Sequence, residues 1–181
     1  EAVHYTMFFH VAARLHPFIG LITHSATVNH GGGLRRTRER VYANPVLHAR
    51  AMHAAFGGAT PCPVELTCAA QHSPGAWPGR ATTEAMSAVS VAAAVTEGGD
   101  VLLSLANRGL AGPVGVEVRL WDDTVEGTAE VRTLSSGNPW GRNSIDRPDA
   151  ITPKVSSVKV MRGEFAVRVP LYGVVVAKIP G

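Results

Sequence analysis

The sequence lacks the features of a membrane-spanning, secreted or disordered chain. Only 17% of its 181 residues are charged and 6% are aromatic, whereas 45% are hydrophobic, which predicts a globular protein. No apolar run reaches the roughly 20 residues that a membrane-spanning helix requires. No basic segment precedes an apolar stretch near Glu1, so no signal peptide is predicted. Glu1 is not a start methionine, and Ala2–Phe18 already has a helical composition, so we expect a piece of a longer protein.

Cysteine is nearly absent as well. Cys62 and Cys68 flank a predicted strand, which would hold their α-carbons about 20 Å apart if extended. A disulfide between them would require a tight reversal of the chain instead. We therefore expect two free thiols, which suit a reducing compartment and favour a cytoplasmic protein.

Positive charge is in slight excess but is not concentrated. The formal net charge is +3, and the one cluster of basic residues comprises Arg35, Arg36, Arg38 and Arg40. Binding to a nucleic-acid backbone requires a continuous basic patch, because the phosphates supply most of the non-specific affinity. The sequence therefore predicts no nucleic-acid partner.

The stretch from residue 21 to residue 44 organises the first part of the chain. Leu21–Val28 is mainly β-prone and long enough for one strand. Gly31–Gly33 then allows a bend, an arginine-rich loop follows, and Asn44-Pro45 has the composition of a capped helix start. A strand, a long loop and a helix in this order form half of a βαβ unit, and in α/β barrels such loops carry the chemistry.

Helices are predicted on both sides of this strand. Val3–Leu15 is apolar over most of its surface and is ended by Pro17. Pro45–Phe56 is followed by Gly57-Gly58, a frequent signal at a helix C-terminus. We therefore predict that residues 1–58 are a slice of an α/β domain, too small to close a core alone, and that residues 59–181 form a second domain.

Residues 59–181 contain short β-prone segments with turn signals about every 8–12 residues, which is typical of an antiparallel β-sandwich. The predicted strands are Pro63–Thr67, Val89–Val95, Val101–Ala106, Val114–Trp121, Thr128–Leu134, Val155–Val160, Glu164–Val169 and Val174–Ile179. Residues 89–106 and 155–169 are predicted to form two hairpins. The prolines of the loop from Ser135 to Pro153 indicate that packing rather than strand pairing orders it.

Two strands of this region predict which side chains are buried. Val114–Trp121 alternates, with its valines on one face, so Trp121 lies on the opposite face. In the nearly all-apolar closing strand, Val174 and Val176 share a face that we expect to lie in the sandwich core.

Asn29 and His30 are the candidate substrate ligands, because they follow the predicted strand at its carboxyl end. The alternative is that they only brace the loop through hydrogen bonds. Gly31–Gly33 beside Arg35 and Arg36 could form a phosphate cradle, but no Gly-Lys-Ser/Thr sequence follows. A plain bend is the alternative for the glycines.

Metal-binding and acid–base groups are sparse in residues 1–56. Neither predicted helix offers two histidines at i and i+4 with a neighbouring carboxylate, so no metal site is predicted. The carboxylates up to Phe56 are those of Glu1 and Glu39, and Glu39 lies in the arginine-rich run, where we expect an ion pair. These two residues cannot supply a facing acid and nucleophile.

Several segments together resemble the C-terminal portion of the α-L-arabinofuranosidases of glycoside hydrolase family 51. The most specific of them is the Asn-Ser-Ile-Asp-x-Pro sequence within Asn143–Pro153. The other segments are Ser25–Asn29 with Gly31–Gly33, Tyr42–Pro45, Leu102–Arg108, Phe165–Pro170 and Tyr172–Val176. The resemblance covers nearly the whole chain.

The resemblance implies an α+β fragment: the last helix, strand and helix of a (β/α)8 barrel, followed by an antiparallel β-sandwich of jelly-roll type. Val3–Leu15 would be the seventh barrel helix, Leu21–Val28 the eighth strand and Pro45–Phe56 the eighth helix. In this alignment Ala26 occupies a position that often holds a sugar-contacting amide in the family, which is a departure from the family pattern.

The resemblance also implies an activity for the parent protein. Members of the family hydrolyse terminal arabinofuranosyl residues by a retaining mechanism, with two glutamates whose carboxyl groups lie about 5–5.5 Å apart. Those glutamates follow the fourth and seventh barrel strands, upstream of Glu1, so this chain holds no catalytic residue and is expected to be inactive alone. The parent is expected to be a homo-oligomer without a metal or an organic cofactor.

The competing hypothesis is a non-catalytic β-sandwich module that binds carbohydrate or a partner chain. A sugar-binding platform needs two or three coplanar aromatic rings. The tryptophans available for it are Trp77, Trp121 and Trp140.

Overall fold

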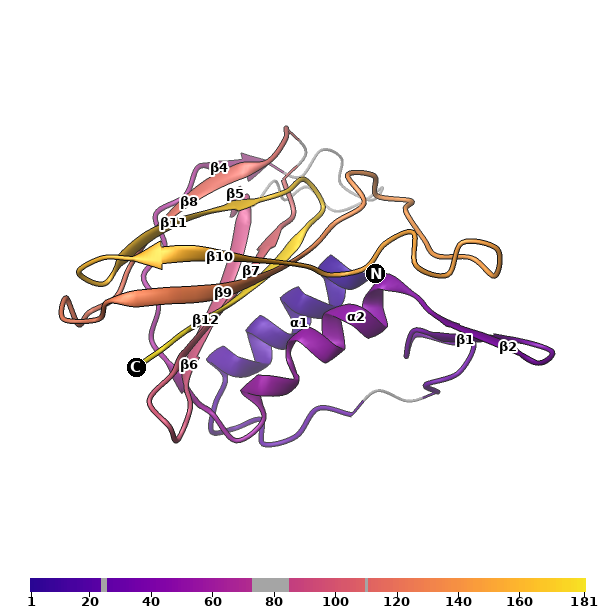
Figure 1. Cartoon of the computed structure of the whole chain (residues 1–181), viewed down its shortest axis with the longest axis horizontal. Helices are drawn as coiled ribbons and strands as arrows, with labels where there is room; N and C mark the ends of the chain where they lie inside the picture. Colours follow the sequence, from indigo (N-terminus) through magenta and orange to yellow (C-terminus); the bar gives the residue numbers. More distant parts are fainter. Residues whose placement is uncertain (24–25, 73–84, 110) are drawn as a thin grey trace.

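The computed structural model describes residues 1–23, 26–72, 85–109 and 111–181, and Figure 1 shows their arrangement. The helical elements are α1 (Ala2–Arg14), α2 (Pro45–Met52) and a 3-10 turn (Ala54–Phe56). The strands are β1 (Leu34–Thr37), β2 (Arg40–Ala43), β3 (Thr60–Cys62), β4 (Ala70–His72), β5 (Ala85–Ser87), β6 (Val89–Val95), β7 (Val101–Asn107), β8 (Val114–Arg119), β9 (Gly127–Leu134), β10 (Lys154–Val160), β11 (Glu164–Val169) and β12 (Val174–Ile179).

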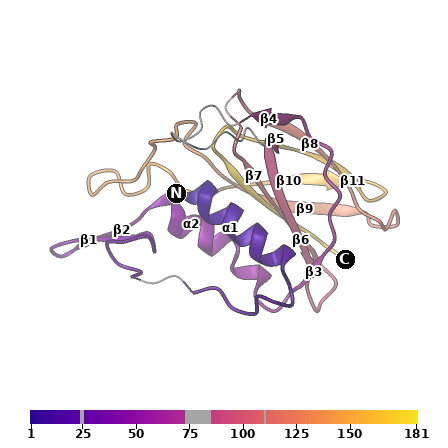
Figure 2. The same ribbon diagram turned by 180° about the vertical axis from the view of Figure 1, so that it is seen from behind.

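A six-stranded antiparallel sheet in the order β10-β9-β12-β7-β6-β3 forms the middle of the molecule. The β8–β11 pair packs on one face of this sheet through the larger apolar core. Helices α1 and α2 cover the other face through a second core (Figures 1 and 2). The α+β architecture with antiparallel sheets agrees with the sequence-based expectation.

Strand β12 corrects one prediction about the core. Val174 and Val176 are buried, but they pack in the core between the sheet and the helices. Val175, Ala177 and Ile179 are the residues of β12 that enter the core between the sheets. The prediction was wrong because both faces of this central strand are covered, so its pattern is apolar throughout and does not mark one face.

The predicted hairpin over residues 155–169 is also wrong. β10 pairs with β9 in the six-stranded sheet, whereas β11 pairs with β8 in the opposite sheet. A two-residue turn at Arg162 and Gly163, both with positive φ, joins them, and one bridge between Met161 and Glu164 closes it. The turn was correctly predicted, but each strand finds its partner elsewhere and the chain crosses from one sheet to the other.

Two other predictions for the sandwich are confirmed, and one is wrong. β6 and β7 form the predicted antiparallel hairpin. The valines of β8 pack against the larger core from one face, and Trp121, just after the strand, is 85% exposed. The predicted strand over residues 63–67 does not form; β3 lies just before it and pairs with the edge of β6.

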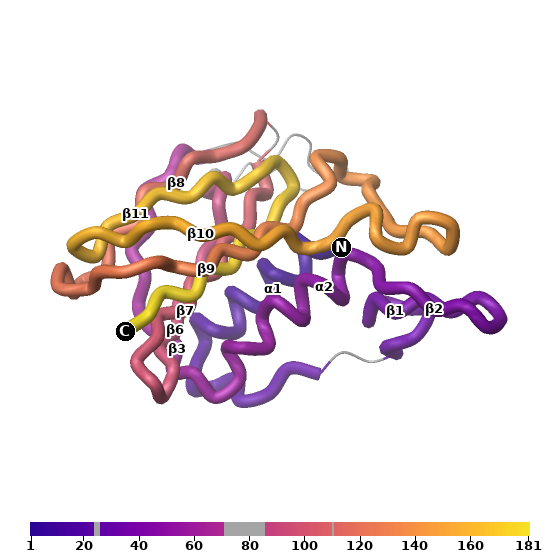
Figure 3. Tube along the Cα trace, in the orientation of Figure 1, coloured from indigo at the N-terminus to yellow at the C-terminus, as the bar shows by residue number. Residues whose placement is uncertain are grey.

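The two predicted helices are present and lie side by side on the sheet, both beginning at the end of the molecule that carries the N-terminus (Figure 3). In the described part of the predicted strand Leu21–Val28, the pairing is one bridge from Val28 to Leu34; residues 24 and 25 lie outside the described residues. A parallel barrel strand needs hydrogen-bonding neighbours on both sides. The arginine-rich segment instead forms the β1–β2 hairpin.

A chain of hydrogen bonds joins the helices to the sheet. His10 on α1 contacts Ser90 Oγ of β6 through Nδ1 at 2.9 Å and Ser104 Oγ of β7 through Nε2 at 2.7 Å. His53, which follows α2, contacts Ser104 Oγ through Nε2 at 2.8 Å and Ala49 O through Nδ1 at 2.7 Å. The helical layer therefore has polar as well as apolar contacts with the sheet.

Two smaller findings complete the fold. Cys62 and Cys68 are free thiols, as expected, and both pack against the larger core. Neither described helix has the length and apolar composition needed to cross a membrane.

Candidate functional site

Asn29 and His30 lie at the bend before the β1–β2 hairpin, and both are exposed. Asn29 has a φ of 61°, and its Oδ1 accepts a hydrogen bond of 2.7 Å from the backbone N–H of Arg36. The carbonyl oxygen of His30 accepts a hydrogen bond from the guanidinium of Arg35. Loop-bracing contacts are therefore present, and a role for either residue as a sugar ligand stays a prediction.

The glycines of the bend are required by close packing. A Cβ on Gly32 would lie 2.3 Å from Thr27 Cα, and one on Gly33, whose φ is 90°, would lie 2.6 Å from Leu47 N. The two amides donate to Ala26 O and His30 O, respectively, at 3.4 Å. Because these N–H groups are engaged within the loop, the geometry favours a plain bend over a phosphate cradle.

Arg35 connects this bend to the start of α2. The helix begins at Pro45 as predicted, but Asn44 makes no capping hydrogen bond with its side chain. With its amide turned so that Oδ1 faces Arg35, Asn44 accepts from the guanidinium Nε at 3.0 Å. Arg35 also lies 3.9 Å from the carboxylate of Glu1.

A cleft of about 410 Å³ lies between α1, the segment after it and the glycine bend. Its walls include Glu1, His4, Tyr5, Phe8, Ile22 and Gly31. Burial raises the pKa of Tyr5, and the positive charge and hydrogen bond of Arg50 partly oppose this rise. The cleft combines aromatic surface with polar groups beside the predicted ligands, although Asn29 and His30 do not themselves line it.

The two carboxylates of the first 56 residues lie at opposite ends of the β1–β2 hairpin. Glu1 is next to Arg35 near its base, whereas Glu39 is in the two-residue turn between Thr37 and Arg40 at its tip. No ion pair of Glu39 is found within the described ranges. Over the same ranges, no three side chains of His, Cys, Asp or Glu come together in a way that could hold a metal ion.

Apolar side chains are exposed along α1 and the segment that follows it. Phe18 and Leu21 are 91% and 80% exposed, which is unusual for large apolar residues so close together. Phe8, Val11 and Leu15 continue this surface along the helix.

The loop between β9 and β10 holds a residue whose role sequence reasoning missed. Asn143 is buried; its Nδ2 donates to Ala43 O at 2.8 Å and to Ile151 O at 3.0 Å, and its Oδ1 accepts from Ile151 N at 2.8 Å. One carboxamide thus closes the loop and ties it to the end of β2. The Asn-Ser-Ile-Asp-x-Pro sequence was the available signal, but spacing alone does not identify these partners.

The exposed tryptophans bear on the competing hypothesis. Trp140 is 86% exposed in this loop, and Trp121 is similarly exposed after β8, while Trp77 lies outside the described residues. Ring–ring contacts among the described residues are confined to the helical layer and the 3-10 turn, where Phe9 and His53 have centroids 4.6 Å apart. The rings of the two described tryptophans therefore do not contact each other.

No protein-family model matches the sequence, and no curated protein matches it either. Among solved structures, the glycoside hydrolase family 51 arabinofuranosidase of Xanthomonas axonopodis pv. citri is 18% identical, with a TM-score of 0.85 over 99% of this chain and 35% of that one. The thermostable family 51 α-L-arabinofuranosidase of Thermotoga petrophila is 16% identical, with a TM-score of 0.84 over 99% of this chain and 38% of that one. The chain thus spans little more than a third of their length.

A third neighbour shows how widely the fold is shared. The catalytic domain of a glycoside hydrolase family 30 xylanase from Talaromyces cellulolyticus is 14% identical, with a TM-score of 0.65 over 100% of this chain and 35% of that one. The resemblance noted in the sequence is confirmed at the level of the fold, with higher TM-scores for the family 51 enzymes.

Proposed function

We propose that the chain is the C-terminal portion of a retaining α-L-arabinofuranosidase that removes terminal arabinofuranosyl residues from arabinose-containing polysaccharides and oligosaccharides. The observation that carries the proposal is the match of the fold, over 99% of the chain, to family 51 arabinofuranosidases. Sequence segments that resemble the same family, above all Asn143–Pro153, support it. The parent protein would be a cytoplasmic homo-oligomer that needs no metal or organic cofactor.

In this proposal residues 1–58 are the last helix, strand and helix of a (β/α)8 barrel, and residues 59–181 are a jelly-roll sandwich. The common direction of α1 and α2 supports this, because neighbouring barrel helices run parallel (Figure 1). The exposed apolar surface at Phe18 and Leu21 supports it too, since further barrel elements would cover it. Leu21–Val28 would become the eighth strand when a parallel neighbour pairs with it.

The catalytic glutamates are assigned to the parent protein outside this chain. A glycosidase needs an acid to protonate the leaving oxygen and a nucleophile on the other side of the same bond. Glu1 and Glu39 lie at opposite ends of the β1–β2 hairpin, and neither matches a catalytic strand end of the family. Asn29 and His30 would contact the arabinofuranosyl ring. The 181-residue chain alone has no general acid, so it lacks a rate advantage of about 10²–10⁴-fold.

The test compares the 181-residue chain with a protein extended upstream through seven barrel strands. The extended protein should release aryl alcohol from an aryl α-L-arabinofuranoside, and the 181-residue chain should do so no faster than buffer. In the extended protein, Asn29→Ala should lower the rate, whereas Lys159→Gln on an exposed face of β10 should not. An aryl β-xyloside is the competing substrate, because the fold is shared with a xylanase.

Two outcomes would contradict the proposal. Turnover by the 181-residue chain that disappears in a Glu39→Gln variant would make the arginine-rich hairpin the active site. An extended protein that cleaves the xyloside but not the arabinofuranoside would assign the parent to a different substrate class.

The second candidate function is a carbohydrate-binding module without catalysis, favoured by the exposure of Trp121 and Trp140. A glycan array probed with the purified chain separates the two functions. Binding to neutral glycans that is lost in both Trp121→Ala and Trp140→Ala, together with an inactive extended protein, would support the module.

A further inference from the structure

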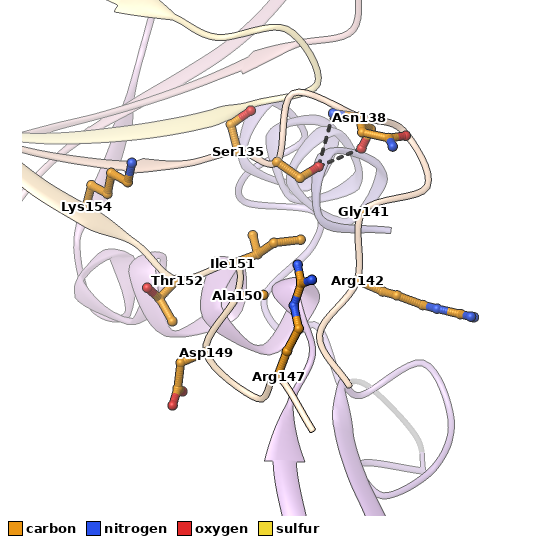
Figure 4. A pocket seen from close by; sticks show the side chains of 11 residues that line it. Ser135, Asn138, Gly141, Arg142, Arg147, Asp149, Ala150, Ile151, Thr152 and Lys154 are labelled. Carbon is orange, nitrogen blue, oxygen red and sulfur yellow. Dashed lines mark hydrogen bonds between the residues drawn. The ribbon is translucent and has the colours of Figure 1, made fainter. Parts of the chain in front are cut away.

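The loop between β9 and β10 encloses a polar cleft of about 460 Å³, far along the chain from the predicted sugar ligands. Its lining includes Ser135, Ser136, Arg142, Arg147, Thr152 and Lys154. Hydroxyl groups and cations therefore share one concave surface, shown in Figure 4.

The loop is held in shape by its own contacts. Asn143 closes it through the three hydrogen bonds described above. A Cβ on Gly141 would lie 2.2 Å from Ser136 Oγ, so a glycine is needed for the loop segments around Ser136 and Gly141 to pack together. Ser144 and Arg147 exchange backbone hydrogen bonds of 3.1 and 3.2 Å, which fixes the turn that carries Arg147. The cleft is thus formed before any ligand binds.

Two cations of the cleft are not neutralised. Arg147 reaches into the cleft, whereas Asp149, which also lines it, has its carboxylate turned away from Arg147 (Figure 4). Within the described ranges, neither Arg147 nor Lys154 has a carboxylate within 4.0 Å. An unpaired guanidinium in a preformed cleft favours a carboxylate, which it can bind through two parallel hydrogen bonds.

The arginine-rich hairpin lies beside this loop and adds to its charge. Arg40 donates to Ile145 O and lies 3.9 Å from Asp146. Residues 34–43 and 135–154 together contain seven basic and three acidic side chains, a net charge of +4, whereas the whole chain carries +3. The fold therefore places the arginine cluster of the sequence beside the basic residues of this loop.

We propose that this cleft binds a uronic acid residue of an acidic polysaccharide, with its carboxylate on Arg147 and Lys154. The hydroxyl of Thr152 is suited to a sugar hydroxyl, and the exposed Trp140 lies between the lining residues Asn138 and Gly141 in the sequence. The inference rests on the proposed function, because it narrows the proposed substrates to arabinose-bearing polymers with an acidic backbone. A nucleic acid is disfavoured, because the cations line a cleft rather than a continuous track.

The test titrates the 181-residue chain with trigalacturonate and, as the matched neutral ligand, with the carboxyl-reduced trisaccharide, by calorimetry at low ionic strength. Trigalacturonate should bind, and the neutral ligand should bind at least about tenfold more weakly, because a charge-assisted contact is lost. The affinity should fall as NaCl rises, since exposed charges are screened. Arg147→Gln and Lys154→Gln should each weaken trigalacturonate binding about tenfold.

Lys159→Gln is the matched control, because it removes one exposed positive charge from the same strand as Lys154 without touching the cleft. Equal binding of the two trisaccharides would overturn the proposal, as would an equal loss in Lys159→Gln. Tighter binding of a single-stranded oligonucleotide that depends on Arg147 would overturn it in favour of a nucleic acid.

The experiment separates this inference from the proposed function. The titration involves no catalysis, so selective trigalacturonate binding alongside an extended protein without arabinofuranosidase activity would refute the proposed function alone. An active extended protein whose cleft does not distinguish the two trisaccharides would refute the cleft assignment alone.

Discussion

Acidification should destabilise the contact between the helices and the six-stranded sheet, because two neutral imidazoles are buried there. His10 has a pKa lowered to about 3, chiefly by burial and further by the charges of His53 and Arg14. His53 has a pKa lowered to about 4 by burial, against the opposing hydrogen bond to Ala49 O. An imidazole in the unfolded chain has a pKa of about 6.5.

The hydrogen bonds assign the tautomer of each neutral imidazole. A carbonyl oxygen only accepts, so Nδ1 of His53 carries the proton that it donates to Ala49 O. Its Nε2 then accepts from the Ser104 hydroxyl, whose oxygen accepts from Nε2–H of His10. Nδ1 of His10 accepts in turn from the Ser90 hydroxyl. Protonation of either ring would place a second donor against a hydroxyl that already donates to it.

The magnitude follows from linkage. Because both folded pKa values lie below the unfolded value, the stabilisation is complete above about pH 6.5 and is lost as the pH falls toward 4 and then 3. At pH 5 each imidazole binds a proton in the unfolded chain but not in the folded one, which costs about 2 kcal/mol. The free energy of unfolding should therefore fall by about 4 kcal/mol between pH 7.5 and pH 5.

Urea unfolding at a series of pH values measures this loss. His10→Gln and His53→Gln should each lower stability at neutral pH but reduce the loss between pH 7.5 and pH 5 by about half. His4→Gln is the control, because His4 lies on the same helix but is exposed, and this variant should keep the full loss. A loss below about 1 kcal/mol in the parent chain, or NMR titration of either buried ring near pH 6.5, would refute the neutral hydrogen-bonded pair.

Three further predictions concern stability. Val176→Asp should destabilise the chain by several kcal/mol, because it buries a carboxylate between sheet and helices; Val155→Asp, at an exposed position of β10, should shift the urea midpoint little. Gly33→Ala should lower the free energy of unfolding by about 1–3 kcal/mol, because the new Cβ is strained at this φ and meets Leu47. Gly58→Ala has the strain but no such contact, so it should lower the free energy of unfolding less in the same urea assay. Asn143→Ala should lower the free energy of unfolding by about 1–3 kcal/mol and speed hydrogen exchange at the Ile151 amide. A slow-exchanging Ile151 amide in this variant would show that other contacts hold the loop.

Local patterns predicted much of the secondary structure, because the signals involved are short in range. The alternation of Val114–Trp121 reports one buried and one exposed face, and both appear in β8 and Trp121. The helix start at Pro45 and the β6–β7 hairpin depend on neighbouring residues only, so they too were predicted correctly. The capping role of Asn44 was wrong because Arg35, nine positions away, takes its side chain.

Strand partners and faces depended on contacts that no local pattern contains. β12 is apolar on both sides, so only the presence of α1 and α2 shows that Val176 faces helices. β10 and β11 are adjacent in sequence and joined by a tight turn, yet each gains more pairing in a different sheet. Leu21–Val28 has strand composition, but backbone pairing requires neighbours, and the structure provides one bridge to the described residues 21–23 and 26–28.

The candidate sites divide in the same way. The sequence by itself identified Asn29 and His30 as polar residues after a β-prone run, and the family resemblance came from contiguous motifs. Only the tertiary structure decided that Asn29 Oδ1 binds Arg36 N, and that the arginine-rich hairpin adjoins the loop around Arg147. Hydrogen-bond partners and the electrostatic environment of a side chain depend on distances in space, which a local sequence pattern does not contain. Arg40, for example, donates to Ile145 O although the two residues are 105 positions apart in the sequence.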